Sequence, residues 1–373
     1  MRRSAVLTAV FAVIALAVVS APGVAAAEVT RTVKADLAAP GAGAWFIENL
    51  VGTMKVVPGT GSGVVAVATV HAESDAIAAL ISIEQVDGGK TGPGLRVKYP
   101  VDTHTMYRYP RNNDGKSNAW LSWMGAGKSN LKYDGSHVTV SGNDGVLLYV
   151  DVEVQVPARN TGSGALRNHV GNISAKGVEG GFSFESSSGN ILLDKVAGMI
   201  GVETGSGDVE ARDGGGVLSV ETGSGDVTVE RFSGESISCE VGSGDVTVRS
   251  GSARRLTIET GSGDVEAIAM DVEEFTSETG SGDVILENAG ARLAKVVTEA
   301  GSGDVTLRLG ANASFQVNAD QGSGDLVSRF SDAQAIVKGR EVVGYKRGDA
   351  RIQIDVTTGS GDITVEPGGK ASV

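Results

Sequence analysis

A Gly-Ser-Gly-Asp tetrapeptide recurs through the second half of this 373-residue chain and limits what the chain can fold into. Its aspartates stand at positions 208, 226, 245, 264, 283, 304, 325 and 362, at intervals of 18, 19, 19, 19, 21, 21 and 37 residues. Upstream, Asn190 and Asn172 continue the register in 18-residue steps. A repeat of this length is typical of stacked supersecondary units, so we expect about ten stacked rungs of 18–21 residues.

Each repeat also alternates between apolar and polar residues. After Asp226, the apolar Val227 and Val229 flank the polar Thr228, and a second alternating stretch in the next repeat contains Ile237 and Cys239. This period of two predicts strands with one buried face. Two short strands cannot bury such a face alone, but copies stacked on one another form a continuous core. The sequence therefore predicts an all-β, parallel β-solenoid (β-helix-like).

The glycine content agrees with this interpretation. Gly accounts for 54 residues without a three-residue period, which excludes collagen. In a solenoid each rung must reverse direction within a few residues, and stacked turns leave little room for side chains. The last interval of 37 residues fits either two periods or one rung with an inserted hairpin around 339–351.

The first 27 residues have the layout of a secretory signal peptide. Arg2 and Arg3 precede an uncharged run over 5–19, and the stretch closes on small residues, with cleavage expected after Ala27. The remaining sequence has no apolar run long enough to span a bilayer. We therefore expect an exported protein that is secreted, periplasmic or associated with the cell surface, with no membrane span in the mature chain.

Two further regions follow the signal peptide. Residues 28–157 predict an N-terminal β region that caps the solenoid of residues 158–373. An aromatic and basic insertion at 105–135 interrupts the β region, and its predicted contact residues are Tyr107, Tyr109, Trp120 and Trp123. These aromatic side chains either pack over the open end of the solenoid or form an exposed loop that stacks on sugars or binds an anionic surface.

Stacking the repeats would align two columns of acidic residues beside the glycine turn. The first column holds the aspartate of each motif, and the second holds an acidic residue five positions earlier. The candidate ladder comprises Asp208, Asp226, Asp245, Asp264, Asp283, Asp304, Asp325, Glu203, Glu221, Glu240, Glu259, Glu278 and Glu299. By contrast, the position four residues after each aspartate mixes both signs of charge.

Two explanations are open for these columns. Carboxylates about 4.8 Å apart repel by roughly 1 kcal/mol in water, so something must offset a run of them. Each aspartate could accept backbone N–H groups from its own turn, which would make the column structural. Alternatively, the carboxylates and turn carbonyls could bind calcium. Calcium is the one cofactor that the pattern suggests.

The composition argues against several other functions. Acidic residues outnumber basic ones by 45 to 32, which disfavours nucleic acid as a partner. Cys239 is the single cysteine and is expected in the core, and the four histidines show no ligand spacing. The repeated aspartates share equivalent environments, so nothing separates their pKa values as catalysis would require. We expect no enzyme; a polysaccharide-active β-helix enzyme is a distant alternative.

The repeats also resemble a known family. Thr-Gly-Ser-Gly-Asp-Val repeats after a signal peptide are similar to those of the secreted bacterial "putative adhesin" β-strand-repeat family, a domain of unknown function. The opening stretch 46–56 and the closing stretch 352–365 look like that family's two ends. The resemblance implies an exported, non-catalytic binding or structural protein whose partner is a glycan or another cell-surface component. A calcium-stabilised structural repeat protein is the alternative, and no oligomeric state is predicted.

Overall fold

The computed structural model describes residues 28–38, 41–110, 128–157, 159–288 and 290–368. The regular secondary structure of these residues is almost entirely β-strand, with one short α-helix, α1 (Asp75–Ala78), and one 3-10 turn, η1 (Gly89–Thr91). The chain divides after residue 173 into two compact units, whereas the sequence placed the boundary at 157/158. None of the described helices has the length and apolarity needed to cross a membrane.

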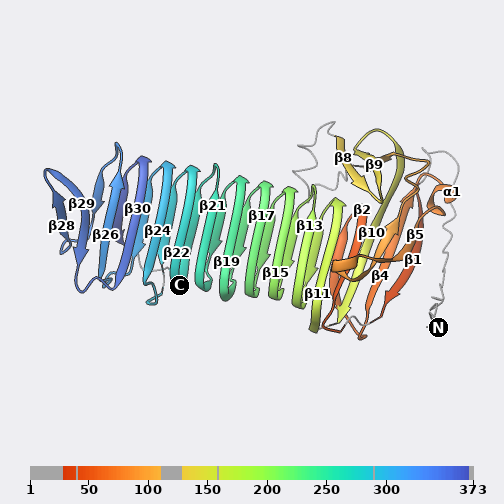
Figure 1. Ribbon diagram of the computed structural model, residues 1–373, viewed down its shortest axis with the longest axis horizontal. Helices are drawn as coiled ribbons and strands as arrows, with labels where there is room; N and C mark the ends of the chain where they lie inside the picture. The colour runs from red at the N-terminus through yellow and green to blue at the C-terminus, as the bar shows by residue number, and fades with distance from the viewer. Residues whose placement is uncertain (1–27, 39–40, 111–127, 158, 289, 369–373) are drawn as a thin grey trace. The chain divides into compact units, whose positions relative to one another are not determined.

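In unit 2 each rung consists of a long strand, a glycine turn and a short strand. For example, β15 (Ala197–Ser206) leads through a turn into β16 (Val209–Arg212), and the next rung repeats this arrangement with β17 (Gly215–Ser224) and β18 (Val227–Glu230). Long strands pair with long strands and short with short in parallel, and among the described residues the register shifts only at 216–217 and 267–270. The pairing is that of a parallel β-solenoid with two facing sheets (Figure 1).

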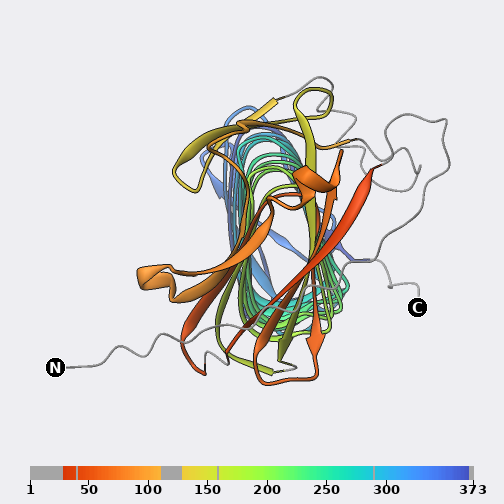
Figure 2. The same cartoon turned by 90° about the vertical axis from the view of Figure 1, so that its right-hand side faces the viewer.

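The remaining strands of this stack follow the same order. They are β13 (Glu179–Ser186), β14 (Ile191–Asp194), β19 (Ser233–Ser243), β20 (Val246–Arg249), β21 (Ser252–Thr260), β22 (Val265–Ser281), β23 (Val284–Asn288), β24 (Lys295–Ser302) and β25 (Val305–Leu309). β22 is longer because it combines a short strand with the following long one. Viewed end-on, the rungs lie one behind another as a flattened loop (Figure 2).

The core of unit 2 lies between the two sheets. Val227 and Val229 of a short strand and Ile237 and Cys239 of the next long strand are all buried, as the alternation predicts. Burial raises the pKa of the Cys239 thiol to about 12, so this cysteine is a small apolar core residue without a reactive thiolate.

A column of complementary side chains fills the corner where each short strand leads into the next long one. The buried Phe232 occupies the space beside Gly214, where a Cβ would lie 2.8 Å from the phenylalanine ring. Met270 likewise lies over Gly251, with its methyl carbon 3.4 Å from the site of a Cβ. Large and small residues thus compensate for each other between neighbouring rungs, which keeps the corner close-packed.

The glycine turn at the opposite corner is fixed by backbone contact between rungs. Gly263 has φ +145°, and a Cβ there would lie 2.1 Å from the carbonyl oxygen of Gly244 in the preceding rung. Thr279, which begins the next motif, points inward and donates its hydroxyl to the carbonyl of Gly263 at 3.1 Å. The motif is therefore a structural unit: glycine lets the turns stack, and threonine satisfies a turn carbonyl.

The last rung lies out of sequence order. β30 (Ile352–Ser360) and β31 (Ile363–Pro367) fit between the rung of β24 and β25 and the rung of β26 (Phe315–Gln321) and β27 (Leu326–Ser328). Ile363 pairs with Val305 on one side and with Leu326 on the other. Figure 1 shows β30 between β24 and β26. The rungs of β24–β25 and β26–β27 are therefore consecutive in sequence but separated in space by the last rung.

A hairpin separates the two rungs that cause this inversion. β28 (Gln334–Lys338) and β29 (Glu341–Arg347) pair antiparallel, and β29 also pairs antiparallel with β26. The sequence allowed an inserted hairpin in the 37-residue interval, and the structure contains one over 334–347. The return of the chain into the interior of the stack was not predicted.

Unit 1 contains the remaining strands. They are β1 (Val29–Leu37), β2 (Ala44–Val51), β3 (Met54–Gly59), β4 (Val64–Ala72), β5 (Ser82–Asp87), β6 (Pro93–Lys98), β7 (Met106–Arg108), β8 (Lys128–Tyr133), β9 (Ser136–Ser141), β10 (Val146–Pro157) and β11 (Arg159–Val170), with β12 (Ile173–Lys176) at the boundary. β4 pairs antiparallel with both β1 and β10, and β2 pairs parallel with β11. β2 and β3, joined at Gly52, form a strand–turn–strand whose strands pair parallel with β11 and β10, respectively.

The turn glycines provide a test of this stacking. We expect Gly263→Ala to lower the free energy of unfolding by about 3 kcal/mol, because both φ and the neighbouring carbonyl oppose a side chain. Gly339→Ala is the control, since Gly339 has φ +71° but no atom within 4 Å of its Cβ position. Its loss should be about 1–2 kcal/mol. Urea unfolding followed by circular dichroism measures both, and equal losses would contradict the stacking argument.

Candidate functional site

The motif aspartates form a continuous hydrogen-bonded ladder along one corner of unit 2. The backbone N–H of Asp226 donates to Oδ1 of Asp208 at 3.1 Å, and the N–H of Asp245 donates to Oδ1 of Asp226 at 3.0 Å. The same bond, at 2.8 Å, links each later pair in spatial order. That order is Asp245, Asp264, Asp283, Asp304, Asp362 and Asp325, so the inserted last rung continues the ladder.

This geometry corrects the local interpretation of the aspartates. The sequence predicted that each carboxylate accepts N–H groups of its own turn, whereas the structure places the donor in the neighbouring rung. The reason is register: parallel rungs bring each carboxylate beside the next equivalent N–H group. Asn190 accepts the N–H of Asp208 through Oδ1 at 2.9 Å, so the bond does not require a charge. The aspartate column therefore has a structural role between rungs.

The glutamate column lies on the outer face of the long strands. Glu203, Glu221, Glu240, Glu259, Glu278 and Glu299 are exposed and stack in register. Within the described chain, none of these six carboxylates makes a hydrogen bond or ion pair, so they remain available to a partner. Asp320 lies five positions before Asp325, but Thr357 of the inserted rung separates it from Glu299.

We call these two columns together the acidic edge, comprising the motif aspartates 208–362 and the six glutamates. The mixed-sign column at the other end of the short strands behaves differently, because Arg249 and Arg212 reach Glu230 at 3.1 Å and 3.6 Å. Charges there neutralise one another between rungs. Like charges therefore accumulate at the acidic edge and not in this mixed-sign column.

Metal binding at the acidic edge stays a prediction. Among the residues that the structure describes, no group of three or more His, Cys, Asp or Glu side chains is placed to hold an ion. In the ladder from Asp226 to Asp362, one oxygen of each carboxylate is already used by a backbone N–H group, which leaves the second for solvent or a cation.

The prediction of an exposed aromatic contact loop is wrong for Tyr107 and Tyr109. Tyr107 is fully buried and packs edge-on against Tyr99 at 5.4 Å, and Tyr109 is almost buried beside Tyr149 at 5.1 Å. Both rings belong to the core of unit 1 because β7 pairs with β9 and β10. Trp120 and Trp123 lie outside the described residues, so the hypothesis of a contact loop stays a prediction for them.

Unit 1 also contains a histidine clamped between two carboxylates. His71 on β4 meets Glu28 through Nδ1 at 2.5 Å and Asp151 through Nε2 at 3.2 Å, and its ring stacks on Tyr149. The hydroxyl of Tyr149 donates to the same Glu28 carboxylate at 2.9 Å. Burial opposes a charge on His71, but the hydrogen bonds to the two carboxylates outweigh it and raise the pKa of the ring above 6.5.

A second charged cluster crosses β2, β6 and β11. Glu48 accepts from Nε of Arg96 at 2.6 Å and contacts Nε2 of His169 at 3.0 Å. Burial works to raise the pKa of Glu48, but hydrogen bonds with His169 and Arg96 hold it below 4.5. Arg96 also donates to Asp134 at 2.9 Å. These paired charges tie strands together, and the cluster resembles a structural network more than a reactive centre.

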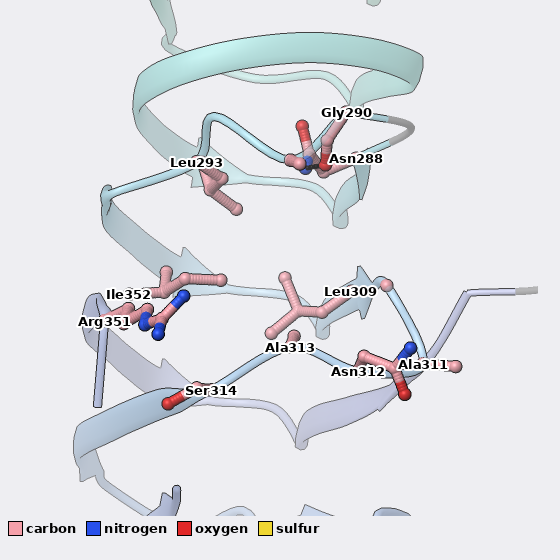
Figure 3. Close-up of a pocket in the computed structure, with 12 residues that line it drawn as sticks. Asn288, Gly290, Leu293, Leu309, Ala311, Asn312, Ala313, Ser314, Arg351 and Ile352 are labelled. Atoms are coloured by element: carbon pink, nitrogen blue, oxygen red, sulfur yellow. Dashed lines mark hydrogen bonds between the residues drawn. The ribbon is translucent and has the colours of Figure 1, made fainter. Parts of the chain in front are cut away.

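A cavity of about 370 Å³ lies within unit 2, at the corner opposite the acidic edge. Residues of two corner loops line it: 288 and 290–293 between β23 and β24, and 309–314 between β25 and β26. Arg351 and Ile352, where the inserted rung begins, form one side. Figure 3 shows Leu293 and Leu309 facing each other across this space.

Sequence reasoning missed the cavity and the two histidine clusters. The cavity had a sequence signal, because the intervals ending at Asp304 and Asp325 are 21 residues and the preceding ones are 18 or 19. The added residues enlarge the corner loops that line it. The two histidine clusters had no sequence signal, because residues such as His71 and Asp151 are distant in sequence and meet only through the pairing of β4 with β10.

The fold and the acidic edge define a class of repetitive all-β protein, and the sequence comparisons name its family. Residues 149–366 match the family model described as Toastrack DUF4097. The chain therefore belongs to this family, whose domain has no assigned function. No protein of curated function matches the sequence.

Several solved structures resemble the model weakly. A "putative adhesin" from Parabacteroides distasonis has 11% identity and a TM-score of 0.38, with 90% of this chain and 96% of that chain covered. A "putative adhesin" from Parabacteroides merdae has 12% identity and a TM-score of 0.35, covering 90% and 95%. A "putative lipid binding protein" from P. distasonis has 11% identity and a TM-score of 0.34, covering 89% and 96%. The family assignment rests on the domain match alone.

The ladder can be tested by separating its hydrogen bond from its charge. We expect Asp245→Asn to preserve the acceptor for Asp264 N–H and to relieve repulsion, leaving the melting temperature unchanged or higher at low salt. Asp245→Ala removes the acceptor and should cost about 0.5–1.5 kcal/mol. Calorimetric melting at low and high salt measures both variants. A loss in the Asn variant equal to that in the Ala variant would mean that the charge itself is required.

The His71 cluster predicts a pH-dependent stability. A histidine with a raised pKa in the folded state stabilises the fold fully below about pH 6.5, and this contribution is lost as the pH rises through the folded pKa. We expect His71→Gln to cost about 1–2 kcal/mol at pH 5 and progressively less toward pH 9. Melting from pH 5 to 9 tests this, with the exposed His137→Gln as control. A pH-independent difference would contradict it.

Proposed function

We propose that this protein is an exported, non-catalytic β-solenoid that acts as an adhesin or cell-surface binding and structural protein. The observation that carries the proposal is the acidic edge, where six exposed glutamates stack beside a ladder of aspartates and have no partner among the residues that the structure describes. The predicted signal peptide supports export. Its cleavage after Ala27 would leave every described strand intact, since β1 begins at Val29.

The geometry of the edge suits a multivalent contact. Equivalent carboxylates repeat at the spacing of strands, about 4.8 Å. Each exposed ion pair contributes little on its own, about 0.2–1 kcal/mol, but a regular row can engage many groups of an extended partner at once. The partner we propose is a glycan or another cell-surface component that presents positive charge or hydrogen-bond donors at matching intervals.

The arrangement of the carboxylates favours binding over catalysis. Acid–base catalysis needs two groups whose environments push their pKa values apart. Along the acidic edge, each rung repeats the environment of the one before it. Two shifted carboxylates of unit 1, Glu48 and Asp151, are held by ion pairs and hydrogen bonds that span strands, which accounts for their shifts structurally.

The proposal can be tested on glycan arrays and whole cells with purified mature protein. The variant Glu221→Gln, Glu240→Gln, Glu259→Gln, Glu278→Gln removes four unpaired charges of the acidic edge. We expect its binding to fall by about tenfold or more, because four exposed contacts are lost. Its melting temperature should not decrease, since none of these side chains makes a hydrogen bond or ion pair within the described chain.

A matched control removes four exposed carboxylates elsewhere: Glu84→Gln, Asp102→Asn, Glu341→Gln, Asp349→Asn. This control should bind like the wild-type protein. Equal binding of all three proteins, or no binding to any glycan or cell, would overturn the proposal. Running each assay with added calcium and with chelator also tests the calcium alternative, which predicts a higher melting temperature with the ion.

A further inference from the structure

The cavity between the two enlarged corner loops has an apolar interior. Leu293, Leu309 and Ile352 line it and are buried, each at most 9% exposed. They come from three different rungs, so the surface they form is fixed by the solenoid and not by a single loop. Elsewhere along this corner, side chains such as Phe232 and Met270 fill the equivalent space. Here the lengthened loops leave it open.

A single unpaired cation stands at the side of this cavity. Arg292, Arg308 and Arg347 lie nearby in the chain, and each pairs with a carboxylate at 3.0 Å or less: Asp271, Glu366 and Asp332, respectively. Arg351 has no ion pair within the described residues, even though Asp349 is only two positions away. Figure 3 shows its guanidinium beside Ile352 at the cavity. Its charge is therefore available to a ligand.

Other polar side chains also line the cavity. Asn312 is exposed and contributes an amide opposite Arg351, at the other end of the cavity. Asn288 is nearly buried, and its amide already donates to Gly290 at 2.7 Å, so it shapes the wall and is not free for a ligand. The cavity thus offers one cation, one free amide and an apolar interior.

We propose that this cavity binds a small amphiphilic monocarboxylate, with the carboxylate on Arg351 and the apolar chain between Leu293 and Leu309. A guanidinium matches a carboxylate in charge and bidentate geometry, and the buried leucines favour an aliphatic chain over a sugar. A volume of about 370 Å³ is at the small end of ligand sites. The site lies at the corner opposite the acidic edge, where an anion meets no column of like charge.

The site is independent of the proposed surface contact, and its test uses octanoate as the probe. We expect titration calorimetry to detect octanoate binding to the full mature chain, and 1-octanol to bind about tenfold more weakly because it lacks the charge. Arg351→Gln should weaken octanoate binding by about tenfold to a hundredfold and leave octanol binding unchanged. Arg340→Gln removes an exposed arginine at the hairpin turn and should have no effect.

A second variant tests the apolar interior. Ala313→Phe should fill the cavity and abolish binding of both octanoate and octanol, while the melting temperature stays within a few degrees of wild type. The proposal is overturned if wild-type protein binds no octanoate. It is equally overturned if octanoate binds but Arg351→Gln and Arg340→Gln weaken binding to the same extent. Acidic-edge binding is measured separately, so failure of one proposal leaves the other intact.

Discussion

In-register stacking of rungs is the constraint on which unit 2 depends. Parallel strands repeat every hydrogen bond from rung to rung, so each turn must have the shape of its neighbour. Gly244 and Gly263 show the consequence, because the carbonyl of one occupies the space of a side chain on the other. Because the backbone repeats, equivalent side chains lie above one another in successive rungs. This explains why carboxylates accumulate at the acidic edge and why large and small side chains compensate for each other along the opposite corner.

Much of this could be predicted from the sequence because the repeat is local. The period of two within each rung placed Val227 and Cys239 in the core, and the spacing of the motif gave the stacking. The predictions that were wrong depend on contacts between residues that are distant in sequence. The donor to each aspartate comes from the next rung, and one-dimensional reasoning assigned it to the same turn. Tyr107 and Tyr109 are buried by strands that are remote in sequence, and the periodicity of a sequence does not predict pairing between remote strands.

The inserted rung shows a different limit. Its strands carry the same alternation and the same motif as the others, so Ile363 could pair equally well at the end of the stack or inside it. Rungs of one repeat are nearly interchangeable, and their order is decided by loops. The hairpin at 334–347 and the two lengthened corners allow the chain to return, and the cavity is a by-product of those loops. The alternation and the motif predict that a segment forms a rung, but they do not predict its position in the stack.

That return has a consequence for how such a protein can change in length. Duplication of a rung between β15 and β23 would simply lengthen the stack, because each new copy meets equivalent neighbours on both sides. Beyond β24 this does not hold, because the last rung, β30 and β31, lies between two rungs that precede it in the chain. Growth, shrinkage and unzipping of the array are therefore confined to the part of the solenoid that precedes β24.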